Sequence, residues 1–170
     1  MTYFKNHFWC MCFLVFSMPV NAHLMVAERG TLNFDETGAY TVISLSASNF
    51  VSADTNRDGH LSFTEFKQAK ETIFKQVLAG IYMQQDKQVR YLEGLMLSPQ
   101  ASHHGNGREI DQIIVMGKFT NVDHTKNLSF HNVFYGDKAH SSVEITAKYK
   151  RLGLKKAFVL TSKKQGERVF

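Results

Sequence analysis

Apolar and polar residues alternate in several short segments, which is typical of β-strands with one buried face. The first two segments, 24–34 and 39–47, contain many Thr, Val, Ile and Tyr residues, and the turn sequence Asp-Glu-Thr-Gly at 35–38 separates them. This pattern predicts a β-hairpin at the start of the domain. Five further strand-like segments follow, separated by turn-rich sequence, at 88–97, 110–120, 128–136, 142–150 and 157–163.

One segment has a helical period instead. From Phe63 to Met83, apolar residues recur at steps of three and four, which places them along one side of a helix, while Gln and Lys occupy the other side. Gly80 is placed where the helix begins to end. The residues of this stripe, which we expect to face the core, are Phe66, Ala69, Ile73, Phe74, Val77, Leu78 and Ile81.

Short strands with no helical pattern between them favour an antiparallel β-sandwich, and we predict an Ig-like one. After the first twenty residues the only proline is Pro99, so no stiff linker marks a second domain. We therefore expect one domain over residues 23–170, with a helix–loop–helix insert at about 45–83, after the first hairpin.

Residues 1–22 have the organisation of a secretory signal peptide. Lys5 provides a positive start, 7–20 is apolar, and Val-Asn-Ala at 20–22 resembles a small-residue cleavage site. A membrane anchor is the alternative, but the apolar run is shorter than the roughly 20 residues that a helix needs to span a bilayer. We expect cleavage after Ala22, a periplasmic or secreted protein, and no transmembrane span in the mature chain.

Removal of the signal peptide changes the composition. Both cysteines, Cys10 and Cys12, lie within it, so the mature chain has no disulfide and depends on its core, with or without a metal, for stability. The full chain carries 20 Lys and Arg residues against 15 Asp and Glu residues, and only Lys5 is lost, which leaves an excess of about four positive charges. The basic residues near 148–156 are too dispersed to indicate nucleic-acid binding.

The segment Asp-Thr-Asn-Arg-Asp-Gly-His-Leu-Ser-Phe-Thr-Glu at 54–65 matches a twelve-residue calcium loop in full. Such a loop needs oxygen ligands at positions 1, 3, 5, 7, 9 and 12 and a Gly at position 6, which is Gly59 here. Position 7 contributes its backbone carbonyl, and position 9 acts directly or through water. The predicted Ca²⁺ ligands are Asp54, Asn56, Asp58, His60, Ser62 and Glu65.

Alternatives to calcium explain less of this pattern. A turn that caps the following helix would account for Asp58 and Gly59 but not for Glu65. Magnesium prefers octahedral geometry and retains its waters, so a bidentate Glu favours calcium. Only three ligands are charged, which predicts a dissociation constant of about 10⁻⁵–10⁻³ M.

The flanking sequence completes the helix–loop–helix pattern only in part. The entering helix, 44–53, is rich in Ser and predicted to have about two turns. Such loops usually occur in pairs, but the one other candidate, 123–134, has Leu128 at position 6 and Phe134 at position 12 and is rejected. A lone loop favours a fixed structural clip over a sensor.

Histidines provide a second hypothesis. After cleavage, His23 would be the N-terminal residue, and its imidazole and free amino group offer two nitrogens to a copper or nickel ion. His103 and His104 lie in a Gly-rich segment and are further candidates, although adjacent histidines in such loops are usually solvated. No nucleophile–base spacing or phosphate-binding loop is present, so we predict that the protein is not an enzyme.

Several sequence segments also resemble those of a known group of proteins. They are residues 22–50 followed at once by the calcium loop, Leu-Glu-Gly-Leu-Met-Leu-Ser-Pro at 92–99, Ile-Ile-Val-Met-Gly-Lys-Phe-Thr at 113–120, and the closing segment 157–170. Together they resemble bacterial exported proteins with one EF-hand, which are similar to the extracytoplasmic domain of hydrogenase/urease-accessory (HupE/UreJ-type) membrane proteins. The resemblance implies a periplasmic β-sandwich that works beside a separate polytopic membrane protein. The expected function is calcium clipping of the EF-hand insert onto a partner-binding β domain, and the oligomeric state is left open.

Overall fold

The computed structural model describes residues 28–102, 107–135 and 141–170. Its first two strands, β1 (Arg29–Asp35) and β2 (Gly38–Ser46), form the predicted hairpin, with Asp35 opposite Gly38. A Cβ at Gly38 would lie 2.0 Å from the carbonyl oxygen of Phe119, so the backbones of β2 and the neighbouring strand approach closely here. The pairing of Asp35 with Gly38 confirms the predicted hairpin and its turn.

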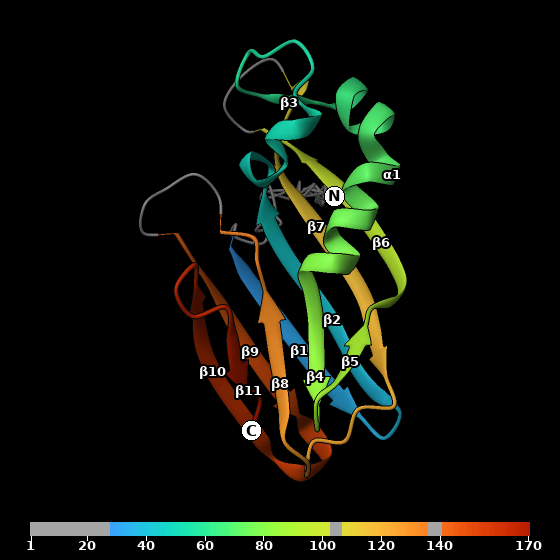
Figure 1. Ribbon diagram of the computed structural model, residues 1–170, viewed down its shortest axis with the longest axis vertical. Helices are drawn as coiled ribbons and strands as arrows, with labels where there is room; N and C mark the ends of the chain where they lie inside the picture. The colour runs from blue at the N-terminus through green and yellow to red at the C-terminus, as the bar shows by residue number, and fades with distance from the viewer. Residues whose placement is uncertain (1–27, 103–106, 136–140) are drawn as a thin grey trace, which may run out of the picture.

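The hairpin forms the centre of a large sheet (Figure 1). Its strand order is β10-β9-β1-β2-β7-β3, and β6 also pairs with β7. Every strand pair of this sheet is antiparallel except β1 with β9, which run parallel, so the expectation of a purely antiparallel fold is wrong for this pair. The bounds of the added strands are β3 (Leu61–Ser62), β6 (Glu93–Ala101), β7 (Glu109–Thr120), β9 (Ser142–Tyr149) and β10 (Leu154–Thr161).

A second, four-stranded sheet has the order β11-β8-β4-β5. It consists of β4 (Ile81–Gln85), β5 (Gln88–Tyr91), β8 (Leu128–Asn132) and β11 (Gly166–Arg168). Figure 1 shows it lying over one face of the large sheet. The ring of Phe119 from β7 meets that of Phe130 from β8, with centroids 6.2 Å apart, so side chains of both sheets share one core.

The segment 88–97 is not one strand, as its alternation had predicted. It divides at the buried residue Leu92, and β5 joins the small sheet whereas β6 joins the large one. Gly94 has a φ of +59°, and the pairing of β6 with β7 shifts between Glu93 and Met96. A left-handed glycine at a bulge allows the chain to change direction without steric cost.

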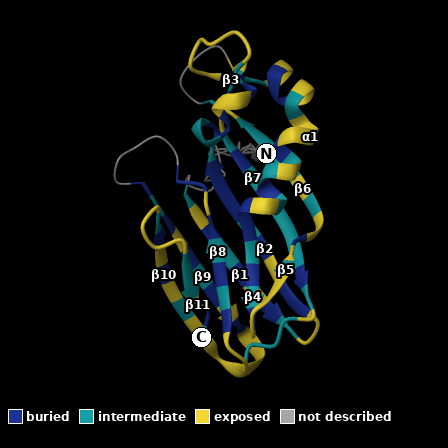
Figure 2. Cartoon of the chain, viewed as in Figure 1, coloured by how far each residue is buried: buried dark blue, intermediate teal, exposed yellow. Residues whose placement is uncertain are grey.

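The amphipathic helix is α1 (Phe63–Gly80). It buries Phe66, Ile73 and Val77 and ends earlier than predicted, because Ile81 and Met83 belong to β4 and are fully buried there. Figure 2 shows buried residues along the inner side of α1 and between the sheets. Since α1 runs directly into β4, the helix and the small sheet lie on the same face of the large sheet.

Two short 3-10 helices complete the described fold. The first, η1 (Ala47–Ala53), follows β2 at once and occupies the place of the predicted entering helix, whose first three residues instead belong to β2. Phe50 has φ −118° and ψ 40°, which divides η1 into two short turns. The second, η2 (Lys150–Leu152), links β9 to β10 and ends at Gly153.

Candidate metal centre

The loop 54–65 lies between η1 and α1 at one end of the large sheet. The hydroxyl of Ser46 accepts a hydrogen bond from the backbone N–H of Ser48 at 3.4 Å, which caps η1 as the chain leaves β2. η1 then buries Ala47, Phe50 and Ala53, so Asp54 begins the loop from an anchored position.

The first carboxylate of the loop organises its turn. Oδ1 of Asp54 accepts a hydrogen bond from the backbone N–H of Arg57 at 2.7 Å, and Oδ2 accepts one from the N–H of Gly59 at 2.9 Å. Gly59 has a φ of +83°, a conformation that L side chains rarely adopt, and apart from its two chain neighbours no described residue comes within 4 Å of a Cβ built there. Glycine is therefore required at position 59 by the backbone conformation of the turn and not by the closeness of neighbouring atoms.

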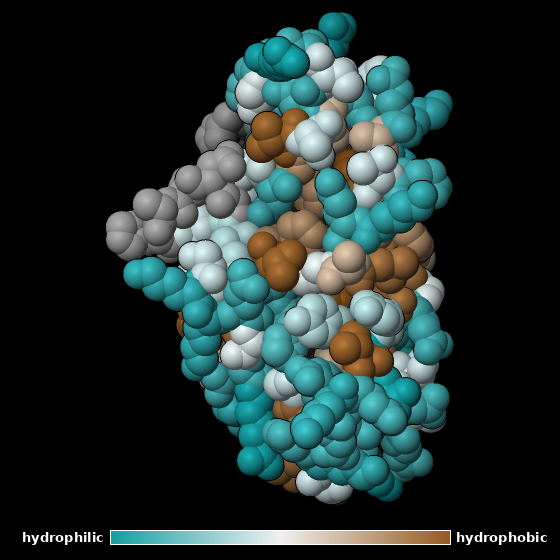
Figure 3. Space-filling view, viewed as in Figure 1, coloured by the Kyte–Doolittle hydropathy of each residue, from teal (hydrophilic) through white to brown (hydrophobic). Residues whose placement is uncertain are grey.

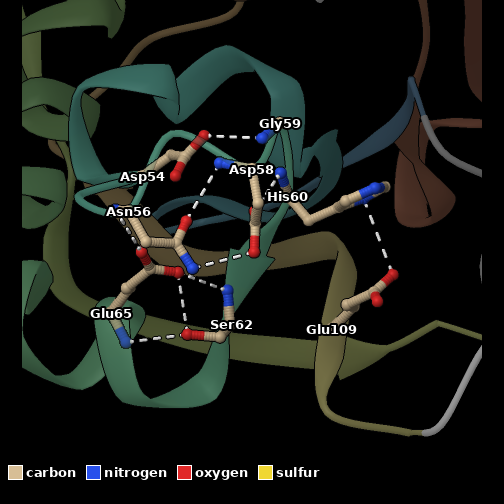
Figure 4. A network of polar contacts seen from close by, with 8 residues as sticks. All are labelled: Asp54, Asn56, Asp58, Gly59, His60, Ser62, Glu65 and Glu109. Atoms are coloured by element: carbon tan, nitrogen blue, oxygen red, sulfur yellow. Dashed lines mark hydrogen bonds and ion pairs between the residues drawn. The ribbon is translucent and has the colours of Figure 1, made fainter.

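Asn56 and Asp58 face each other across the same turn. Nδ2 of Asn56 donates to Oδ2 of Asp58 at 2.8 Å, and the backbone N–H of Asp58 donates to Oδ1 of Asn56 at 3.0 Å. Oδ1 of Asp58 also accepts from the N–H of His60 at 2.9 Å. Positions 3 and 5 of the loop are therefore held together by both side-chain and backbone contacts (Figure 4).

Glu65 joins the loop to the helix. One carboxylate oxygen, Oε2, accepts hydrogen bonds from the backbone N–H and the hydroxyl of Ser62, at 3.0 and 2.8 Å. The other, Oε1, accepts from the N–H and hydroxyl of Thr55 and from the N–H of Asn56, at 2.9, 3.1 and 3.3 Å. The hydroxyl of Ser62 accepts from the N–H of Glu65 in return, which completes a capping box for α1.

These contacts determine the charge of Glu65. The hydrogen bonds from Ser62 are the largest cause of a pKa lowered from 4.5 to about 2, and those from Asn56 and Thr55 add to it, while burial acts in the opposite direction. Only 5% of Glu65 is exposed. The carboxylate is therefore ionised over the whole neutral range, as a metal ligand must be.

The far side of the loop is joined to the large sheet. Leu61 and Ser62 form β3 and pair with Ile110 and Glu109 of β7, and the backbone N–H of Phe63 donates to the carbonyl of Arg108 at 3.3 Å. Leu61, at position 8 of the loop, is 4% exposed and belongs to the main core. The side chain of His60 turns away from the other loop residues toward Glu109 (Figure 4).

The donor set consists of oxygens, which suits a hard cation such as Ca²⁺. The side chains of Asp54, Asn56, Asp58, Ser62 and Glu65 all take part in hydrogen bonds within the 54–65 segment. Their carboxylates are directed at loop N–H and O–H groups, and over residues 28–102, 107–135 and 141–170 no three His, Cys, Asp or Glu residues form a group arranged to hold a metal ion. The structure thus gathers the predicted ligands in one short loop without aiming three charged ones at a common point.

A cavity of about 330 Å³ adjoins the loop. It lies between η1, the loop and the beginning of β7, and Asp54 is the predicted ligand with a carboxylate on its wall. Its other lining residues are Ser46, Ala47, Ser48, Phe50, Val51, Gly59, His60, Leu61, Ile110 and Asp111.

The alternative metal residues, His23, His103 and His104, lie outside the described residues. Of the described histidines, His131 stacks on Tyr82 with ring centroids 4.7 Å apart, and its Nε2 lies 2.9 Å from the hydroxyl of Ser129. Burial lowers the pKa of His131. The rejected second loop contains strand β8, Leu128–Asn132, where a calcium loop would have its positions 6 to 10.

Glu109 and Thr55 were missed by sequence analysis. Thr55 occupies a loop position that supplies no ligand, and Glu109 is far from the loop in sequence. Only the β3–β7 pairing brings Glu109 to the loop, so the one available sign was the strand-like pattern beginning at 110.

No protein-family model matches this chain, and no curated protein matches it. Among the residues that the structure describes, no helix has both the length and the apolar character that a membrane span requires.

Proposed function

We propose that this chain is an exported, non-enzymatic calcium-binding protein, in which calcium in the 54–65 loop clips the helical insert onto a β domain that binds a partner. The observation that carries the proposal is the match between motif and local geometry. Ser62 and Glu65, at loop positions 9 and 12, form the capping box that begins α1 where an exiting helix must begin.

The hydrogen bonds within the loop support a clip more than a switch. The loop is fixed at one end by η1, at the other by α1, and along its side by β3 against β7. Calcium in this position would connect all three to the core, because Leu61 and Phe66 pack there on either side of Ser62 and Glu65. We infer that η1, the loop and α1 together are an EF-hand and that the two sheets form an Ig-like sandwich.

Exposed apolar side chains support the partner-binding part of the proposal. Val51 of η1 is 62% exposed, and Val133, which follows β8, is 44% exposed. Figure 3 shows hydrophobic residues gathered across the middle of the face on which α1 lies. The resemblance to HupE/UreJ-type proteins favours a location outside the cytoplasm and a separate polytopic membrane protein as the partner.

The proposal is tested by melting the protein in calcium and in chelator. Wild-type protein should melt at a higher temperature in calcium, and Asp54→Ala should abolish the difference, because it removes the ligand at position 1. Asp111→Ala is the matched control, since it removes an exposed carboxylate from the same cavity wall but outside the loop.

Equal melting temperatures of the wild type in calcium and chelator would contradict the proposal. Metal analysis of protein purified from the periplasm provides an independent test. Copper or nickel in place of calcium would favour the alternative hypothesis centred on His23.

A further inference from the structure

The two-residue strand β3 is held in place by another element. It has only Leu61 and Ser62, and its register partners are Ile110 and Glu109 of β7. A strand of this length contributes too few hydrogen bonds to hold its own conformation. The pairing with β7 therefore helps to hold the backbone of loop positions 8 and 9, together with the capping box that Ser62 forms with Glu65.

A side chain from the same part of β7 faces the residue at position 7. Nδ1 of His60 lies 3.6 Å from a carboxylate oxygen of Glu109, and Figure 4 shows the two side chains directed toward each other. Glu109 pairs directly with Ser62, so its side chain meets that of His60 as a diagonal neighbour on one face of the β3–β7 pair. Glu109 is the more covered of the two, with 33% of its side chain exposed against 61% for His60.

His60 would contribute its backbone carbonyl to calcium, so the direction of its peptide group matters while its ring is free for another contact. We infer that Glu109 is a positioning residue for the proposed calcium site: it holds the His60 ring, and through it the His60 carbonyl, in the orientation that calcium binding uses. The inference rests on the proposed function and adds a residue outside the loop that sets the affinity of the site.

The same strand offers a control for the charge of Glu109. Asp111 lies two residues further along β7 and also borders the loop, since it lines the adjoining cavity together with His60. Among the described residues, the side chain of Asp111 makes no hydrogen bond or ion pair, whereas the side chain of His60 faces that of Glu109. Asp111→Asn therefore removes one negative charge near the loop and leaves the His60 contact intact.

The experiment measures the calcium dissociation constant of the wild type, Glu109→Gln, His60→Gln, the double variant and Asp111→Asn, by following the melting temperature from about 10 µM to about 10 mM calcium. We expect Glu109→Gln and His60→Gln each to raise the constant about two- to fivefold, the range for one polar contact at a partly exposed position. The double variant should be no weaker than either single variant, because both remove the same contact.

Melting in chelator separates positioning from general destabilisation. All variants should melt close to the wild type there, since the His60 and Glu109 side chains are partly exposed. Equal weakening by Glu109→Gln and Asp111→Asn would overturn the inference, because charge alone would then explain the effect. Additive losses in the double variant, or an unchanged constant in Glu109→Gln, would overturn it as well. If the wild type binds no calcium, the proposed function itself fails, and that result is visible before any variant is compared.

Discussion

Glu65→Gln replaces one carboxylate oxygen with an amide nitrogen and keeps the length of the side chain. The two oxygens of Glu65 now accept hydrogen bonds from three backbone N–H groups, those of Thr55, Asn56 and Ser62. An amide has one acceptor oxygen, so whichever way it turns, at least one of these N–H groups faces an NH₂ group.

The cost can be worked from these contacts. Hydrogen bonds to a charged group contribute about 1.5–3 kcal/mol, and these are partly buried, so we expect Glu65→Gln to lower the free energy of unfolding in chelator by about 2 kcal/mol. For a domain of this size, a loss of 2 kcal/mol corresponds to a decrease in melting temperature of about 6 °C.

Calcium adds a second, separable effect. At a calcium concentration about fifty times its dissociation constant, the wild type should gain about 2 kcal/mol, whereas Glu65→Gln should gain almost nothing because the bidentate ligand is lost. Differential scanning calorimetry in calcium and in chelator measures both quantities. Glu71→Gln is the matched control, since Glu71 lies on the exposed side of the same helix.

Two results would refute this reasoning. If Glu65→Gln keeps the calcium-dependent stabilisation of the wild type, Glu65 is not the position-12 ligand. If it is as stable as the Glu71→Gln control in chelator, the hydrogen bonds of the carboxylate do not contribute as the geometry requires.

Three further predictions concern pH and packing. The pKa of Glu65 is lower in the folded protein than in the unfolded chain, so its contribution to stability is present above about pH 4.5 and is lost as the pH falls toward about 2. In urea unfolding measured in chelator at a series of acid pH values, the stability difference between the wild type and Glu65→Gln should therefore decrease over this range. The hydroxyl of Thr41 is buried without a hydrogen-bond partner among the described residues, so Thr41→Val should raise the free energy of urea unfolding by about 1 kcal/mol. A lower free energy of unfolding in this variant would show that the hydroxyl has a hydrogen-bond partner outside those residues. A Cβ at Gly80 would lie 2.6 Å from the ring of Phe134, so Gly80→Ala should destabilise the protein by about 1–3 kcal/mol in thermal melts, although alanine has the better helix propensity. A stabilised variant would contradict the close packing at the end of α1.

Local patterns predicted the elements that depend on neighbouring residues. The hairpin turn at 35–38 and the start of α1 were found because turn and capping residues act within a few positions. The helix end was wrong by three residues, since Ile81 and Met83 fit a helical stripe and a buried strand equally well. Pairing with β8 on one side and β5 on the other makes this segment a strand.

By itself, the sequence determined that this protein is mainly β with one long helix, and that the oxygen-bearing residues of 54–65 have the spacing of a calcium loop. Only the tertiary structure decided that β1 and β9 run parallel, that 88–97 divides between two sheets, and that Glu109 meets His60. The physical reason is sequence separation. Spacing, capping and periodicity act over a few residues, whereas strand pairing between distant segments is chosen by the burial of the whole core.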